Sequence, residues 1–205
     1  MSLPGWTRSY WFVVAVVIVA GILNTLLAVL NTTLFLPFFF DSVFTACTGA
    51  LFGWLPGLLV GLWTNVAFEI VYGFPMTMLP FAVCNMSTGL IIGLMASNGR
   101  FRTGTNATVG LLLVTASNSL LGSLIAAYLY GGITRNAAVD FVVVGLMAAG
   151  RGILSAAFIA RIPANLVDKG IAVLAAFILL RFLSRRYGWP DGAKPSTQRP
   201  TASTL

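Results

Sequence analysis

The sequence predicts an all-α integral membrane protein, a compact bundle of six transmembrane helices with an apolar capping segment before the last helix. Two observations lead to this fold class. Of the 205 residues, 58% are hydrophobic and only 8% are charged, whereas roughly 25% of the residues in a soluble domain are charged. A transmembrane helix needs about 20 apolar residues, so the chain is long enough for six or seven spans and for no additional soluble domain.

The first half of the chain contains four predicted spans. Residues 11–30 form the first, whose apolar stretch is too long for the core of a signal peptide. The apolar stretch 38–72 is too long for one span and suits two short ones. Residues 54–57 supply the break between them, because Pro56 has no N–H to donate and its ring collides with the preceding helical turn. Residues 77–96 form the fourth span.

The second half contains three apolar stretches, residues 107–130, 141–160 and 163–183. Gly131 and Gly132 end the first of them, because glycine readily adopts the left-handed conformation that closes a helix. The number of these stretches that cross the bilayer follows from the distribution of charge.

Lysine and arginine are concentrated before the first span, after the fourth span and at the end of the chain. The positive-inside rule places all three regions in the cytoplasm. Four spans separate the first two regions, so only two of the three later stretches can cross. Arg151 lies in the middle of residues 141–160, where a charge in lipid is costly, and we therefore expect this segment to cap a cavity without crossing.

The predicted organisation is a membrane-embedded helical domain over residues 1–190 and a disordered cytoplasmic tail over residues 191–205, which is rich in polar residues and proline. We expect a multi-pass protein of a bacterial-type cytoplasmic membrane, with both termini in the cytoplasm.

The chain carries few residues that could catalyse a reaction. It has no histidine and five acidic residues, and it contains no G-x-x-x-x-G-K-[ST] nucleotide-binding loop, no H-E-x-x-H motif and no cysteine pair at metal-ligand spacing. We therefore expect no enzyme, with no catalytic, metal or cofactor site, and no nucleic-acid partner. What remains is binding by polar side chains placed inside apolar helices.

Ionisable residues within or beside apolar stretches are candidates for a binding site, because such groups are costly in a membrane. From the residues alone, the candidates for substrate binding are Asp41, Glu69, Tyr72 and Arg151. The planar guanidinium of Arg151 suits a carboxylate or phosphate. The alternative for Asp41 and Glu69, as for the ionisable residues Asp140 and Arg161 on the same side, is that they only mark helix ends at the interface. The aromatic residues nearby suit either an interfacial belt or the lining of a cavity.

Glycines recur every four residues in two segments, at Gly49, Gly53, Gly57 and Gly61 and again at Gly89 and Gly93. Small residues at this spacing let helix backbones approach closely. The pattern favours packing within the chain over a dimer interface, and Pro56 interrupts the first series.

Short motifs in the chain carry a family resemblance. Residues 162–170 read Ile-Pro-Ala-Asn-Leu-Val-Asp-Lys-Gly, and Asn85 lies in an Ala-x-x-Asn-x-x-x-Gly context. With six short spans, basic ends and an acidic residue at the start of the second span, these motifs resemble the substrate-binding S subunits of energy-coupling factor (ECF) vitamin transporters. Residues 162–170 are similar to the opening of the last helix in riboflavin-binding S subunits, with Asp168 as an extra residue before the lysine.

The resemblance implies a protein that captures a vitamin or related small micronutrient with high affinity at the outer face. A shared transmembrane T subunit, driven by two separate cytosolic ATPases, then receives it. The resemblance also implies Asn85, Asn165 and Lys169 as substrate contacts, and the last two lie four residues apart on one helix face. Asp168 is a further candidate. Either it pairs with Lys169 as a structural clamp, or the two point apart and one is free for the substrate.

In the family, the first helix docks on the T subunit through an Ala-x-x-x-Ala face. The corresponding residues here are Ala20, Asn24 and Ala28, with an asparagine in the middle position. Asn24 can hydrogen-bond either across such an interface or to a neighbouring helix of its own chain.

Two other functions remain open. A membrane-embedded sensor or regulatory subunit would bind a small ligand without transporting it, and a membrane enzyme would act on lipid. The substrate itself is not named by the sequence, because an aromatic lining suits flavins, pterins and thiamine-like rings equally and is compatible with lipid-like cargo.

Overall fold

The fold is entirely helical over the part of the chain that the computed structural model describes, residues 10–34, 36, 38–73, 76–134 and 136–190. Of these residues, 82% are helical and none lies in a strand. The elements in chain order are α1 (Tyr10–Thr33), α2 (Val43–Phe52), α3 (Trp54–Val71), the short 3₁₀ helix η2 (Leu79–Phe81), α4 (Ala82–Ser97), α5 (Gly104–Tyr130), α6 (Ala137–Ala148) and α7 (Ile153–Tyr187). The predicted tail, residues 191–205, lies outside the described residues.

Four stretches of the described chain are long and apolar enough to cross a membrane, namely α1, α3, Leu79–Ser97 and α5. Helices α2 and α6 are also apolar but have 10 and 12 residues. At 1.5 Å per residue they are about 15 and 18 Å long, short of a hydrocarbon core of about 30 Å. Length and composition therefore support a membrane protein in which four helices are able to span the bilayer, and they do not confirm the six spans predicted from charge.

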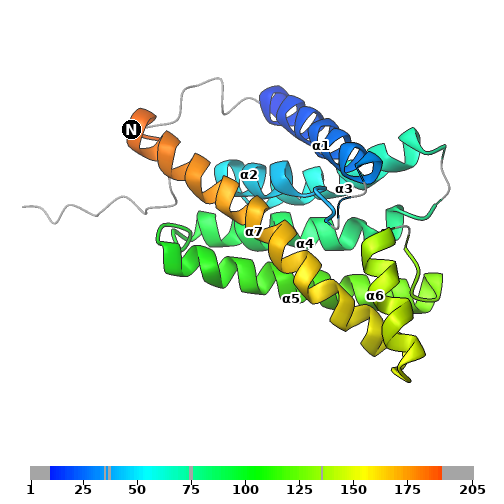
Figure 1. Cartoon of the computed structure of the whole chain (residues 1–205). Coiled ribbons are helices and arrows are strands. Elements are labelled where there is room, and N and C mark those ends of the chain that lie inside the picture. Colours follow the sequence, from blue (N-terminus) through cyan, green and yellow to red (C-terminus); the bar gives the residue numbers. More distant parts are fainter. Residues whose placement is uncertain (1–9, 35, 37, 74–75, 135, 191–205) are drawn as a thin grey trace, which may run out of the picture.

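The long helices run back and forth between two ends of the bundle (Figure 1). Helix α4 packs against α2, α3 and α5, and α7 crosses the bundle against α2 and α5. At one end, α6 packs on the first turns of α7, where Val139 and Val143 meet Ala156 and Ala160. We call this the α6 end. The turn between α4 and α5 and the last turns of α7 lie at the opposite end, which we call the basic end.

The basic end takes its name from the charges that gather there. Arg100 and Arg102 lie in the turn between α4 and α5, and Arg185 and Arg186 lie in the last turn of α7. The start of α5 is capped at this end. Thr103 caps α5 by accepting a hydrogen bond from the backbone N–H of Asn106, 3.2 Å from its Oγ1. The separation of these charges from α6 gives the bundle two chemically different ends.

The break between α2 and α3 lies at Gly53, just before the predicted segment. Gly53 has a φ of +95°, which residues with a side chain rarely adopt. Pro56 lies in the first turn of α3, where its missing N–H would have no partner within the helix in any case. The proline therefore starts the second helix, and the glycine makes the break.

The predicted capping segment, residues 141–160, is wrong as a single unit. Its first part belongs to α6, and its last part forms the first turns of α7. Gly150, with a φ of +85°, lies in the connection between them. The last helix likewise begins at Ile153, and Pro163 lies inside it. Proline removes one helical hydrogen bond, a loss that membrane helices tolerate when neighbouring groups surround the site.

The repeated glycines let α2, α3 and α4 touch at the backbone. A Cβ atom added at Gly49 would lie 2.8 Å from the carbonyl oxygen of Gly89, and one at Gly57 would lie 2.7 Å from the Cα of Gly49. At Gly61 it would lie 2.6 Å from the backbone of Asn85. The packing interpretation of the glycine pattern is therefore confirmed within the chain.

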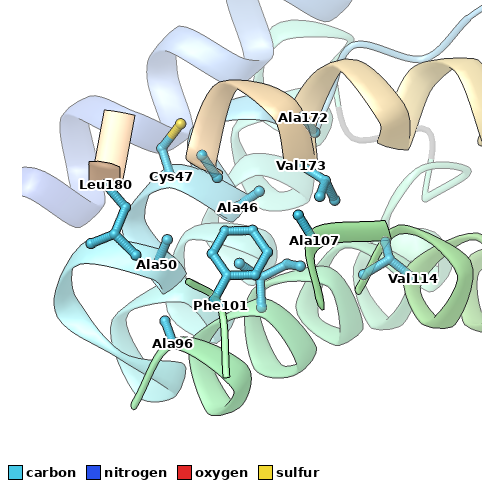
Figure 2. Packing of buried hydrophobic residues seen from close by; sticks show 12 residues of the cluster. Ala46, Cys47, Ala50, Ala96, Phe101, Ala107, Val114, Ala172, Val173 and Leu180 are labelled. Atoms are coloured by element: carbon cyan, nitrogen blue, oxygen red, sulfur yellow. The ribbon is translucent and has the colours of Figure 1, made fainter. Parts of the chain in front are cut away.

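A cluster of buried apolar side chains fills the basic half of the bundle (Figure 2). Phe101, which is fully buried, lies among Ala46 and Ala50 of α2 and Ala107 of α5. Helix α7 adds Leu180 and a run of small residues. Most members are alanine or valine, so the helices approach closely and the packing holds them together. The apolar cluster leaves the polar buried residues for the other half of the molecule.

Candidate functional site

A cavity of about 250 Å³ opens at the α6 end of the bundle. Helices α1, α3, α4, α5, α6 and α7, the short helix η2 and the connections between them form its wall. Its volume is at the lower end of the roughly 300–1,000 Å³ of small-molecule sites. The lining residues are Ala28, Asn31, Thr32, Leu36, Phe38, Phe39, Asp41, Asn65, Phe68, Tyr72, Thr77, Met78, Phe81, Cys84, Asn118, Gly122, Thr134, Asn136, Ala137, Ala138, Arg161, Asn165 and Lys169.

Aromatic rings form one part of the lining. The rings of Phe68 and Tyr72, both from the end of α3, stack with their centroids 5.7 Å apart and an interplanar angle of 7°. Phe81 stacks on Tyr130 at 5.9 Å. Such rings provide an apolar surface on which a planar ligand can lie. Of the aromatic residues expected at this end, Phe38, Phe39 and Tyr72 line the cavity, whereas Tyr128 is exposed.

Helix α7 contributes a polar row to the same cavity. Arg161, Asn165 and Lys169 follow one another at four-residue spacing and all three line the cavity. Each is at most 3% exposed. Residues at this spacing lie on one helix face, and the row covers about 12 Å at 1.5 Å per residue. One face of one helix thus presents a guanidinium, an amide and an ammonium group to the same space.

Lys169 is held by two carboxylates. Its Nζ lies 3.0 Å from Oδ1 of Asp41 and 2.6 Å from Oδ2 of Asp168, and it donates a hydrogen bond of 2.7 Å to Ser42. Asp168 also accepts a 2.7 Å hydrogen bond from the backbone N–H of Phe40. Lys169 and Asp41 line the cavity whereas Asp168 does not. Of the two predicted alternatives for Asp168 and Lys169, the structure has the paired one. The pair forms a clamp, and Lys169 is the member that faces the cavity.

The clamp fixes the connection between α1 and α2. Phe40 has a φ of +52°, which is unusual for a residue with a side chain, and Asp168 holds its N–H in place. Asn31 and Asn136 donate hydrogen bonds of 2.7 and 3.0 Å to the carbonyl oxygen of Phe38. Residues 38–41 therefore form an ordered part of the cavity wall.

Arg161 lies at the other end of the polar row. Its Nη2 donates a 2.8 Å hydrogen bond to the hydroxyl of Thr134, and its Nη1 donates a 3.3 Å hydrogen bond to the carbonyl oxygen of Ala157. Thr134 is in turn 3.3 Å from Oδ1 of Asp140. Among the described residues, no carboxylate lies within salt-bridge distance of Arg161. The guanidinium thus meets acidic groups of the chain only through a hydroxyl.

Amide side chains complete the polar part of the lining. Asn165 donates a 3.0 Å hydrogen bond to Ser119 of α5. Asn118 donates to Thr88 of α4 at 3.1 Å, and Asn65 donates to the carbonyl oxygen of Gly61 at 3.1 Å. These bonds use the amide N–H groups and fix the orientation of each side chain.

Two of the predicted substrate residues, Glu69 and Arg151, lie away from the cavity. Glu69 is 2% exposed and accepts hydrogen bonds of 2.6–2.8 Å from the backbone N–H groups of Met76, Met78 and Leu79, so it shapes the connection after α3. Arg151 is exposed in the connection before α7. Neither lines the cavity.

Asn85 lies directly behind the cavity wall. Its Nδ2 donates a 2.7 Å hydrogen bond to the carbonyl oxygen of Asp41, and it is absent from the lining. Its Oδ1 is buried and has no hydrogen-bond partner among the described residues. Asn85 therefore positions Asp41, one of the groups that do face the cavity.

The predicted docking residues face the interior of the bundle. Ala20, Asn24 and Ala28 are 6%, 0% and 3% exposed. Asn24 donates hydrogen bonds to the hydroxyls of Thr45 and Thr64 at 2.9 and 3.1 Å and accepts one at 2.9 Å from the N–H of Phe44. This face of α1 is therefore occupied by α2 and α3.

Arg161 was not among the predicted substrate contacts, although it is 2% exposed and lines the cavity. Arg161 carries the four-residue spacing that joins it to Asn165 and Lys169, and that signal was present in the sequence. The contributions of Asn31, Asn65 and Asn136 had no such signal, because they reach the cavity from helices and connections whose proximity only the fold establishes.

No known protein family, curated protein or solved structure matches the chain. Within the described residues, no group of three or more His, Cys, Asp or Glu side chains is placed to hold a metal ion. The cavity and the residues around it are therefore the basis for assigning a function.

Proposed function

We propose that the protein is the substrate-binding subunit of an ECF-type importer, capturing a vitamin or related small micronutrient. One observation carries the proposal. A cavity of about 250 Å³ lies within apolar helices and is lined by aromatic rings together with amide and charged groups. Polar and ionisable groups placed inside a membrane protein are costly and mark binding sites or pathways. A cavity that combines them with aromatic walls suits a small ring compound with polar substituents.

The charge distribution supports an outward-facing cavity. The basic end carries Arg100, Arg102, Arg185 and Arg186, and the cavity opens at the opposite end. In the proposed topology the basic end is cytoplasmic, as the positive-inside rule favours, in a bacterial-type cytoplasmic membrane. The chain then crosses six times, through α1, α2 with the connection before it, α3, η2 with α4, α5 and α7. Helix α6 caps the outer end without crossing, and both termini are cytoplasmic.

The energy for uptake would come from other chains. The sequence has no nucleotide-binding loop of the G-x-x-x-x-G-K-[ST] type. The proposed partners are therefore a transmembrane T subunit and two cytosolic ATPases.

Helix α1 offers a surface for the T subunit on its outward side. Val14, Ile18, Ile22, Leu26 and Leu30 recur every four residues and are 44–56% exposed. We propose docking through this row, because the face with Ala20, Asn24 and Ala28 is filled by the protein's own helices.

A second function is favoured by the same position of Asn24. In the family this face of the first helix docks on the T subunit, whereas here it packs inside the bundle. This arrangement suits a membrane-embedded sensor or regulatory subunit, which binds a small ligand without transport and needs no T subunit. The two functions share the cavity and differ in their partners.

Reconstitution distinguishes the two functions. The tagged full chain is co-expressed with the T subunit and ATPases encoded in the same genome, purified and placed in liposomes. The liposomes are supplied with the small-molecule fraction (below 1 kDa) of rich growth medium, and mass spectrometry measures what accumulates inside. The transport proposal predicts a stable complex and ATP-dependent accumulation of at least one compound, which Asn165→Leu should reduce. Binding to the purified chain without complex formation or accumulation would support the sensor.

A further inference from the structure

Arg161 is a buried cation with no carboxylate in direct contact among the described residues. The side chain is 2% exposed, and its two hydrogen bonds go to a neutral hydroxyl and a carbonyl oxygen. A guanidinium has five N–H donors, so three are left without an acceptor from the described residues. A buried charge left unpaired is strongly unfavourable. Asp140 reaches the guanidinium only through the hydroxyl of Thr134, so the protein compensates this charge only in part.

Lys169 differs from Arg161 in its contacts with carboxylates. Lys169 lies on the same face of α7 and is equally buried, but it contacts two carboxylates, from Asp41 and Asp168. The cavity therefore contains one cation that is fully compensated and one that is not. An anion entering the cavity would find its complementary charge at the Arg161 end of the row.

The surroundings of Arg161 leave space beside the guanidinium. Gly122 of α5 lines the cavity next to it, and a Cβ atom there would lie 3.4 Å from Cδ and 3.5 Å from Nε of Arg161. The guanidinium thus lies against bare backbone on that side and borders the cavity on another. Its planar group can form two parallel hydrogen bonds with a carboxylate or phosphate.

We propose that Arg161 binds the anionic group of the ligand, and that the cavity takes a small ring compound carrying a carboxylate or a phosphate. This inference rests on the proposed function, because it requires that the cavity binds a solute. The anionic group contacts the free N–H groups of Arg161, and the ring lies toward Phe68, Tyr72 and Phe81.

Equilibrium dialysis tests the assignment with the small-molecule fraction of rich growth medium as the probe. The full chain in detergent is dialysed against this fraction, and mass spectrometry identifies the compounds enriched over buffer. Arg161→Gln removes the charge, Arg161→Lys retains it without the planar fork, and Arg100→Gln is the matched control at the basic end. A parallel arm uses the same fraction after phosphatase treatment, which separates phosphate esters from carboxylates.

The expected result is an anionic compound enriched by wild type and by Arg100→Gln. Its enrichment falls at least tenfold with Arg161→Gln and by less with Arg161→Lys. Persistence after phosphatase treatment identifies a carboxylate, and disappearance identifies a phosphate ester. If the enriched compounds are neutral or cationic, or if Arg161→Gln enriches the anion as wild type does, the assignment is overturned while the binding function stands. If wild type enriches nothing, both are overturned.

Thermal unfolding of each variant shows whether a loss of binding is caused by a loss of stability. Removing an unpaired buried charge should leave the melting temperature of Arg161→Gln unchanged or raise it in the absence of added solute. A lowered melting temperature would show that Arg161 has a structural role, and it would count against the proposal.

Discussion

Individual polar residues inside these helices serve two different purposes. Asn24 is surrounded by partners from its own chain, with both its amide N–H₂ and its carbonyl oxygen in hydrogen bonds to α2 and α3. Arg161 is equally buried but keeps donors without protein acceptors. The first arrangement fixes the bundle, and the second is what a binding site requires.

Replacing Asn24 by valine should destabilise the bundle. The hydroxyls of Thr45 and Thr64 and the N–H of Phe44 would lose their partner, and hydrogen bonds between membrane helices contribute about 0.6–2 kcal/mol. We expect a loss of about 1–2 kcal/mol in the free energy of unfolding, measured in mixed detergent micelles. The control is Thr33→Val on the exposed side of α1. Equal stability of the two variants would contradict the assigned role of Asn24.

Replacing Asn165 by leucine should weaken solute binding. The amide lies in the middle of the polar row, where Ser119 fixes its orientation, so its loss leaves a polar group of the bound solute unmatched, at a cost of about 1–3 kcal/mol. Calorimetry with the compound identified by dialysis measures this change, and Asn98→Leu at the basic end is the control. Wild-type affinity in Asn165→Leu would remove the residue from the site.

The sequence predicted part of this chemistry at the level of residues. Asn165 and Lys169 were implied by the family resemblance and share one helix face at four-residue spacing, and both line the cavity. Arg151 was selected because it lies within an apolar stretch, whereas Arg161, between the predicted stretches 141–160 and 163–183, also suited an interfacial charge that marks a helix end. Once α7 begins at Ile153, Arg161 joins the row and Arg151 falls in the exposed connection.

At the scale of elements, glycine determines how closely the helices approach. The backbones of α2, α3 and α4 are in direct contact at Gly49, Gly57, Gly61 and Gly89. In lipid, apolar side chains gain little by leaving the solvent, so close packing supplies much of the attraction between helices. A side chain at these positions would separate the helices and reduce that attraction.

Gly57→Ala should therefore be strongly destabilising. Its Cβ atom would lie 2.7 Å from the Cα of Gly49 and 2.9 Å from the carbonyl oxygen of Gly89, and overpacking of this kind costs about 1–3 kcal/mol. The control is Gly145→Ala on α6, where a Cβ atom meets nothing within 4 Å and where alanine favours a helix by up to about 1 kcal/mol. The two variants should shift the unfolding midpoint in opposite directions. A neutral Gly57→Ala would contradict the contact.

Periodicity and turn residues located most elements but not all their boundaries. The ends of α5 at Gly131 and of the first long helix agree with the prediction, because each follows from local chemistry. The helix boundaries predicted at Pro56 and Pro163 were wrong for the same reason. Proline disrupts a helix in water, but its effect depends on its position in the first turn or on the packing around it. Packing of α7 against α2 and α5 is a tertiary property that no local pattern encodes.

At the scale of the whole molecule, the separation of charge from the cavity predicts an orientation. In the proposed topology, the connections before and after α6 are both outside and the turn between α4 and α5 is inside. Single cysteines at Ile133, Arg151 and Asn98, in a chain with Cys47 and Cys84 replaced by alanine, test this in intact cells with a membrane-impermeant maleimide. Cysteines at 133 and 151 should react, and a cysteine at 98 should react only after permeabilisation.

Two labelling results would contradict the proposed topology. Labelling of position 98 alone in intact cells would invert the orientation and place the cavity in the cytoplasm. Labelling of position 133 without 151 would mean that α6 crosses the membrane, in conflict with its 12 residues.

Gly53, the single residue that joins α2 to α3, limits how the sequence of this protein can evolve. An insertion in the first turns of α3 would turn the rest of that helix by about 100° about its axis, carrying Gly57 and Gly61 away from α4 and bringing larger neighbours into their place. The outward positions of this hairpin can accept many amino acids, but its length cannot vary. Related chains should therefore differ here by exchange of residues and never by gaps.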